Sequence, residues 1–180
     1  MVQVYPRNYS CVDLEIRERR LQDAMKTREN GFSLIELLVV VFVILIIAAI
    51  AIPNLIRSQL RAREASAVGS LRVINTACQN YASTYGTGFP ASLSVLGPAA
   101  VPSASSADLL DSILASGFKS GYAFSYSASA PVHGIINSYI IAADPTNRGV
   151  TGQRGFYTDQ ALVIRVDATG TASSSDPPIS

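Results

Sequence analysis

The segment from Leu37 to Ile52, LLVVVFVILIIAAIAI, contains no charged side chain, no polar side chain and no glycine. Together with Leu34 and Ile35 it would span the roughly 30 Å hydrocarbon core of a bilayer, at about 1.5 Å of rise per helical residue. Only a helix can cross lipid as a single segment, because every backbone N–H and C=O must find a partner inside it. We therefore expect a single membrane-spanning helix at this position.

One carboxylate, Glu36, lies directly before this apolar segment. A carboxylate at the edge of a lipid-soluble helix costs free energy unless a cation or water satisfies it. Two interpretations follow from the spacing alone. Glu36 is either an interfacial residue whose side chain reaches water, or a group that pairs with a cation when the helix packs against another.

Charge is balanced along the chain of 180 residues, which is long enough for one modest domain beyond the apolar segment. Six basic and five acidic residues precede Gly31, and eight of each follow it. This balance gives no footprint of nucleic-acid binding. Cys11 and Cys78 lie on opposite sides of the apolar segment, so no disulfide between them is expected, and Cys78 is predicted to be a small buried residue.

The residues from Gly31 to Glu36, GFSLIE, stand before the apolar segment, and Ala51-Ile52-Pro53 closes it. This arrangement resembles the class III signal of type IV pilins and type II secretion pseudopilins. In that family a membrane-bound prepilin peptidase cuts after the glycine and methylates the new N-terminal residue. The resemblance implies cleavage between Gly31 and Phe32, and N-methylation of Phe32.

The resemblance also implies roles for Glu36 and Pro53. Glu36 matches the family's fifth-position glutamate, and the free amine of a processed Phe32 could pair with it within one subunit or between subunits. Phe32 and Glu36 are four residues apart and share a helical face. Pro53 matches the proline that interrupts the family's helix, so a helix kink or local melting is expected over residues 49–53.

Residues 1–31 form the leader in this interpretation, and the resemblance places it in the cytoplasm. A leader of 31 residues is long for the family. Met25 is an alternative start, since it would give the leader MKTRENG, which has a typical length and charge.

An amphipathic helix is predicted to follow the membrane and assembly helix of residues 32–53, over residues 54–86. Its apolar stripe recurs at steps of three and four and is interrupted by one carboxylate: Leu60, Glu64, Ala67, Leu71, Ile74, Cys78, Tyr81 and Tyr85. The opposite face is polar: Arg57, Arg61, Arg63, Arg72, Asn75, Gln79 and Asn80. Gly86 and Pro90 end the helix.

Residues 87–170 are predicted to form a globular head, and residues 171–180 a disordered tail. A short capped helix is expected over the apolar pattern from Leu109 to Leu114, which Ser105–Asp108 precedes and Gly117 closes. Strands are expected at residues 122–127, 138–143, 155–158 and 161–166, the last two joined by a hairpin turn. The predicted fold class is α+β, a long N-terminal helix packed against a small antiparallel sheet of three to four strands.

The sequence offers no catalytic or metal-binding motif. The single histidine, His133, follows Pro131 in a predicted loop, and no nucleophile, base or Cys/His spacing accompanies it. Major pseudopilins often bind calcium in a C-terminal loop, but the segment Asp144–Gly149 lacks an acidic cluster and contains Arg148. We therefore expect a plain β-turn there, no metal ligand and no cofactor, with calcium kept as the less favoured alternative. Many pilins close a C-terminal loop with a disulfide, which this sequence cannot do.

The favoured function is that of a non-enzymatic, type IV pilin-like structural subunit. The resemblance implies a single-pass precursor in the bacterial inner membrane, processed by prepilin peptidase and polymerised by an inner-membrane assembly platform with copies of itself and other pilins. The product would be a surface pilus or, for the alternative of a type II secretion pseudopilin, a periplasmic pseudopilus. A membrane-anchored enzyme or binding domain is a further alternative, and it predicts a polar pocket with paired ionisable groups.

Overall fold

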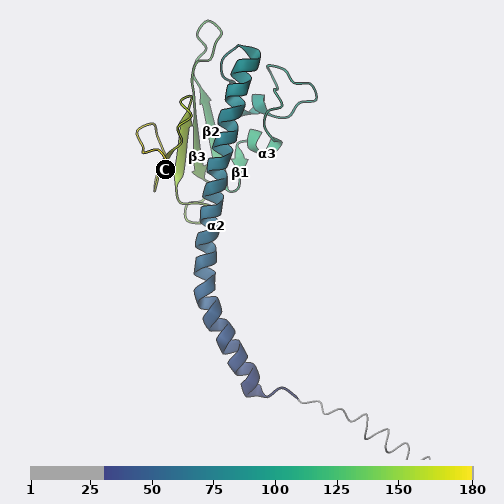
Figure 1. The fold of residues 1–180 in the computed structure, drawn as a ribbon, viewed down its shortest axis with the longest axis vertical. Helices are drawn as coiled ribbons and strands as arrows, with labels where there is room; N and C mark the ends of the chain where they lie inside the picture. The colour runs from purple at the N-terminus through teal and green to yellow at the C-terminus, as the bar shows by residue number, and fades with distance from the viewer. Residues whose placement is uncertain (1–30, 180) are drawn as a thin grey trace, which may run out of the picture. The chain divides into compact units, whose positions relative to one another are not determined.

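The computed structural model describes residues 31–179 (Figure 1). These residues divide after Ala48 into two units. The first element, α2, runs from Leu34 to Tyr85 and therefore begins in the first unit and ends in the second. Helical assignment continues without a break through Pro53. The local melting expected there is not observed, because a proline removes one donor while the neighbouring turns keep theirs. The kink at Pro53 stays a prediction.

A five-stranded sheet and two short helices follow α2 in the second unit. They are η1 (Leu93–Leu96), α3 (Ser112–Ala115), β1 (Phe118–Lys119), β2 (Tyr122–Ala128), β3 (Tyr139–Pro145), β4 (Gly155–Asp159) and β5 (Arg165–Asp167). The strands lie in the order β1-β2-β3-β4-β5, and each neighbouring pair is antiparallel.

The predicted α+β class is confirmed, and the sheet has five strands rather than three or four. The additional strand is β1, which pairs Phe118 with Ala123 and Lys119 with Tyr122. Two residues cannot show the alternation by which a strand is recognised, so this one leaves no signal in the sequence.

The apolar stripe of α2 forms one wall of the head core. The buried residues of α2 are Glu64, Ala67, Ser70, Leu71, Ile74, Asn75, Ala77, Cys78 and Tyr81. The apolar residues among them cluster with large residues of the sheet, including Tyr122, Tyr139 and Phe156. Leu60 and Tyr85, at the two ends of the predicted stripe, are only partly buried.

Asn75 corrects the predicted polar face of this helix, because it is 5% exposed. Its Nδ2 donates a hydrogen bond to Thr158 Oγ1 at 2.9 Å, and its Oδ1 accepts one from the Tyr139 hydroxyl at 3.0 Å. Thr158 and Tyr139 come from β4 and β3. The amide is therefore buried at a place where two strands supply its partners, which satisfies the group that burial would otherwise leave unpaired.

Cys78 lies in the same core and is fully buried, as predicted. Burial raises the pKa of its thiol to about 12, and the neighbouring Tyr126 hydroxyl only partly offsets this. Tyr126 stacks on Tyr139 with ring centroids 5.6 Å apart. The thiol therefore packs as a small apolar group among aromatic rings.

The helix predicted over Leu109 to Leu114 is a single turn, α3, which is capped by Asp111 rather than by the residues up to Asp108. Asp111 Oδ1 accepts from the Leu114 N–H at 2.7 Å, whereas Asp108 has a positive φ of 53°. Leu109 and Leu110 both donate their N–H groups to the Leu96 carbonyl. The left-handed backbone of Asp108 and these bonds to η1 hold residues 108–110 in a non-helical conformation, so the helix begins only after Asp111.

The C-terminal segment differs from the predicted disordered tail. The Val166 N–H donates to the Pro177 carbonyl at 3.1 Å, and the Ile179 N–H donates to the Ile164 carbonyl at 2.9 Å. Ala172 is 4% exposed. Polar composition suggested disorder, but backbone hydrogen bonds with Ile164 and with Val166 of β5 hold the segment at the edge of the sheet.

Replacing Asn75 by Ala should lower the free energy of unfolding by about 1–3 kcal/mol, because the Tyr139 hydroxyl loses its buried acceptor. The measurement is thermal or urea unfolding of the full chain in detergent, followed by circular dichroism. Asn80→Ala changes the same residue type on the exposed face of α2 and should unfold like the wild type. Equal stabilities for the two variants would contradict a structural role for Asn75.

Candidate functional site

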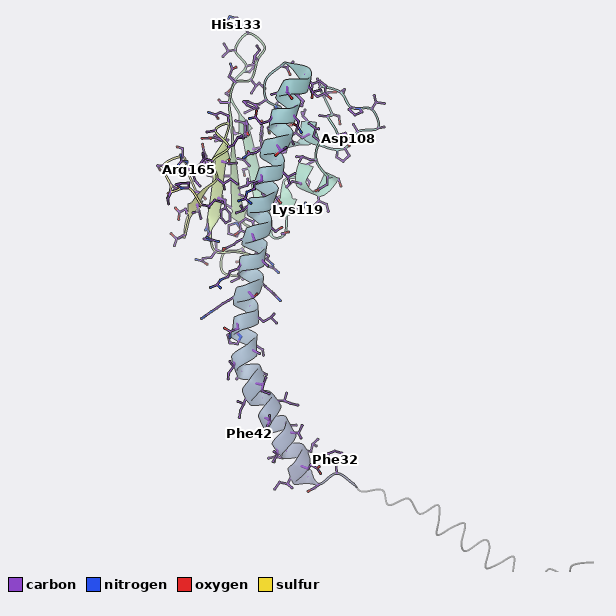
Figure 2. All side chains as sticks on the ribbon, viewed as in Figure 1. Phe32, Phe42, Asp108, Lys119, His133 and Arg165 are labelled. Atoms are coloured by element: carbon purple, nitrogen blue, oxygen red, sulfur yellow. The ribbon has the colours of Figure 1, made fainter. Side chains whose placement is uncertain are left out.

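The first part of α2 presents an apolar surface to the outside on all sides. Every Val, Leu, Ile and Phe side chain between Phe32 and Ile56 is exposed by 46% to 81% of its area. Figure 2 shows Phe32 and Phe42 projecting from this part of the chain. We call residues 32–56 the apolar helix segment, although Phe32 and Ser33 precede the first helical residue.

A helix that is apolar on every side is suited to lipid or to a bundle of helices, and not to water. Among residues 31–179, α2 is the one helix that is long and apolar enough to cross a membrane, and none of the window that meets this criterion is buried. The expected membrane helix is therefore present as a helix, with its surface free for lipid or for other helices.

The predicted cleavage junction lies just outside the helix. Gly31, Phe32 and Ser33 have no regular secondary structure, and the Ser33 carbonyl accepts the Leu37 N–H at 3.2 Å as the helix begins. A side chain at position 31 would meet no atom of the described residues 31–179 within 4 Å. A non-helical peptide without crowding from these residues is a form that a protease can draw into its active site.

Glu36 lies in the first turn of α2 and is exposed. A carboxylate in the first turn stabilises a helix, because its negative charge interacts favourably with the positive end of the helix dipole. None of the three ion pairs within residues 31–179 includes Glu36. Its predicted pairing with the processed amine of Phe32 belongs to a different state of the chain and stays a prediction.

The sequence singled out Glu64 as the one carboxylate in the apolar stripe, and the structure supplies its partners. The Glu64 side chain is 6% exposed, and its Oε2 lies 2.7 Å from Arg154 Nε. Its Oε1 accepts the backbone N–H groups of Gln153 and Arg154 at 3.0 and 3.2 Å. Burial alone would raise the pKa of Glu64, but these hydrogen bonds and the Arg154 guanidinium outweigh it and hold the pKa below its ordinary value.

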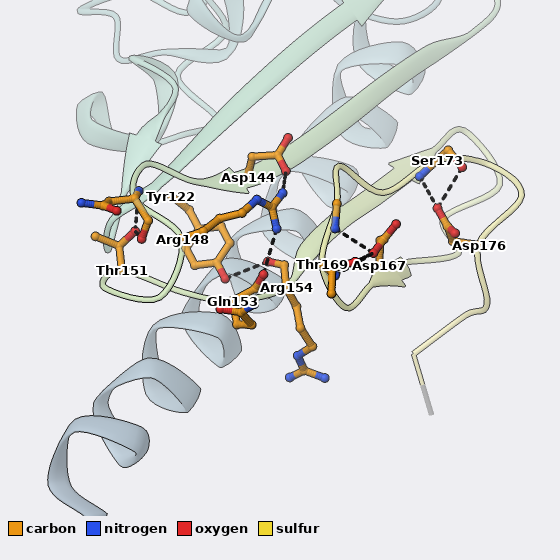
Figure 3. Close-up of polar contacts among 12 residues, drawn as sticks. Tyr122, Asp144, Arg148, Thr151, Gln153, Arg154, Asp167, Thr169, Ser173 and Asp176 are labelled. Atoms are coloured by element: carbon orange, nitrogen blue, oxygen red, sulfur yellow. Dashed lines mark hydrogen bonds and ion pairs between the residues drawn. The ribbon is translucent and has the colours of Figure 1, made fainter. Parts of the chain in front are cut away.

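The loop between β3 and β4, residues 146–154, is fastened to α2 by this carboxylate and by Arg63, whose Nη1 donates to the Val150 carbonyl at 3.0 Å. Figure 3 shows the contacts within the loop. Arg148 pairs with Asp144 at 2.9 Å and donates to the Gln153 carbonyl at 2.8 Å. The loop therefore docks on the helix through charge-assisted bonds, which the sequence pattern did not reveal because the partners are far apart in the chain.

The same loop contains the segment considered for calcium. Asp144 Oδ1 accepts from Arg148, so a guanidinium occupies one side of that carboxylate. Residues 31–179 contain no group of three or more His, Cys, Asp or Glu side chains that could hold a metal ion. His133 is exposed at the tip of the β2–β3 connection, with a positive φ of 51° (Figure 2).

Comparison with known proteins bears on the N-terminal part of the chain. Residues 26–52 match the family model of the prokaryotic N-terminal methylation motif. The chain is also similar to the type IV major pilin protein PilA of Myxococcus xanthus (strain DK1622), with 46% identity over 54 residues. That match covers 30% of this chain and 24% of the relative, so the chain aligns with about a quarter of that pilin's length. No solved structure matches the chain significantly.

Replacing Glu64 by Gln should destabilise the head by about 1–3 kcal/mol at neutral pH, because Arg154 loses a buried anionic partner. The folded pKa of Glu64 is lowered from 4.5, so its contribution is complete above that pH and is lost as the pH falls through the folded value. Unfolding curves of wild type and variant should therefore converge in acid.

Asp108→Asn is the matched control, since Asp108 is exposed and an Asn oxygen can still accept from the Ala99 N–H. It should leave the stability at neutral pH nearly unchanged. A gap between wild type and Glu64→Gln that stays constant from neutral to acid pH would contradict the assigned role of Glu64.

Proposed function

We propose that this chain, whose N-terminal segment belongs to the type IV pilin and pseudopilin family, is a pilin-like structural subunit that polymerises through its apolar helix segment. The observation that carries the proposal is the exposure of every large apolar side chain from Phe32 to Ile56, in a chain with the methylation motif at residues 26–52. Such a surface needs lipid before assembly and other helices afterwards.

Processing would precede assembly. A prepilin peptidase would cut between Gly31 and Phe32 and methylate the Phe32 amine. The open, non-helical conformation of residues 31–33 supports this step, since the scissile peptide need not be unwound from a helix before it is cut.

Assembly would move the apolar helix segment from the bacterial inner membrane into a filament core. Lipid and helix surfaces are equally apolar, so this transfer gains little hydrophobic free energy, and close packing and polar pairs must direct it. Glu36 is the one charged side chain from Phe32 to Ile56. Pairing between Glu36 of one subunit and the Phe32 amine of a neighbour would set the axial register and remove the cost of a buried charge.

The partners in this proposal are copies of the chain, other pilins and an assembly platform in the inner membrane. The product is a pilus on the cell surface, which the similarity to a major pilin favours. A pseudopilin of a type II secretion system shares the same N-terminal features, and filaments confined to the periplasm would indicate that alternative.

Mass spectrometry of the chain from its native host should find a mature protein that begins at Phe32 and carries one methyl group on its amine. Gly31→Val should remain uncut, because a branched side chain would obstruct the peptidase while meeting none of the residues that the structure describes. Gly69→Val, at an equally open position in α2, should be processed normally. A Phe32 N-terminus in the Gly31→Val protein would refute the assigned cleavage site.

Glu36→Ala should insert into the membrane normally and reduce the yield of filaments at least about ten-fold, since a pair worth only about 1.4 kcal/mol changes an equilibrium by that factor. Electron microscopy and immunoblotting of sheared surface material measure the yield. Gln59→Ala removes an exposed polar side chain from the same helix and should assemble normally. Wild-type filament yield from Glu36→Ala would exclude Glu36 from assembly.

A further inference from the structure

Two exposed arginines follow the apolar helix segment at once. Arg57 comes directly after Ile56, and Arg61 lies four residues further on the same face of α2. The 20 residues from Leu37 to Ile56 contain no charged side chain, so Glu36 and Arg57 bound an uncharged stretch. At about 1.5 Å per residue this stretch measures about 30 Å, the thickness of the hydrocarbon core. A helix placed across a bilayer therefore brings Arg57 to the level of the phosphates.

Arg57 and Arg61 share a groove of about 600 Å³ with Arg154. The groove is also lined by Leu60, Glu64, Gln153 and Ala168. Its one carboxylate, Glu64, already accepts two backbone N–H groups and Arg154 Nε. Arg57 and Arg61 take part in none of the ion pairs formed within residues 31–179. The groove therefore carries an excess of positive charge beside an apolar residue, Leu60.

Arg154 is held in position for a ligand in this groove. Its Nε is bound to Glu64 Oε2 at 2.7 Å and its guanidinium carbon lies 5.6 Å from the centre of the Phe156 ring. Figure 3 shows the end of this side chain extending away from the Asp144–Arg148 pair. A fixed guanidinium whose terminal nitrogens remain available is suited to bind a phosphate through two N–H groups.

We propose that Arg57, Arg61 and Arg154 bind the phosphate of an anionic phospholipid while the subunit is stored in the membrane. The inference rests on the proposed function, because it requires the apolar helix segment to lie in a bilayer. A lipid fits better than a carboxylate of a second subunit, since Arg57 reaches the depth of the headgroups in a single inserted chain and Leu60 offers a contact for the first acyl carbons. Bound lipid would fix the depth of the helix and keep the groove occupied until assembly.

Native mass spectrometry of the full chain in detergent tests the proposed lipid binding. The chain is titrated either with phosphatidylglycerol or with phosphatidylcholine of the same acyl chains. The wild type should retain the anionic lipid preferentially. Arg57→Gln and Arg61→Gln should each weaken that retention about five-fold, the effect expected of one basic residue at a charged bilayer surface. Retention of phosphatidylcholine should not change.

Arg72→Gln is the matched control, because Arg72 is exposed on the same helix but does not line this groove. Equal retention of the two lipids by the wild type, or equal loss in Arg72→Gln, would overturn the proposal. The proposal would also be overturned if inorganic phosphate alone saturated the groove at the concentration at which the lipid is added. A chain that is cut at Gly31 and forms filaments but lacks the lipid preference would refute this inference and leave the proposed function intact.

Discussion

The rest of the molecule depends on a single helix, α2, whose two parts face different apolar environments: lipid or other helices for the first part, and the core of the head for the second. From Phe32 to Ile56 its side chains are exposed all round, whereas from Glu64 to Tyr81 one face of it is buried under the sheet. The head has too few residues of its own for a full core, so the helix serves as its second layer. The lipid or the helices that surround the first part of α2 therefore contact the same helix that completes the core of the head.

Patterns that repeat along the chain could be predicted, and contacts between distant residues could not. The uncharged run after Glu36 and the stripe from Ala67 to Tyr81 follow from spacing alone, and both were found as expected. The partners of Asn75 lie 64 and 83 residues away and those of Glu64 lie 89 and 90 residues away, so a local pattern could mark these polar residues but not explain them. The methylation motif is local too, which is why the N-terminal site was recognisable from sequence.

Glu64 shows how a carboxylate is tolerated within the apolar stripe of α2. A buried carboxylate is costly, and here two backbone N–H groups and one guanidinium share its charge. These bonds also determine where the β3–β4 loop sits, because Gln153 and Arg154 belong to it. A residue that disturbs the apolar stripe thus connects the helix with the β3–β4 loop, and it places Arg154 beside the arginines that follow the apolar helix segment.

The C-terminal residues have a consequence for crowded subunits. An open sheet edge with unpaired N–H and C=O groups can recruit a strand from another molecule. Here the Val166 N–H of β5 donates to the Pro177 carbonyl of the tail, and the Ile179 N–H of the tail donates to the carbonyl of Ile164, the residue before β5. Arg165 adds a bond from its guanidinium to the Asp176 carbonyl at 2.8 Å. With that border closed without a disulfide, heads brought close together can touch there through side chains but cannot extend the sheet through β5.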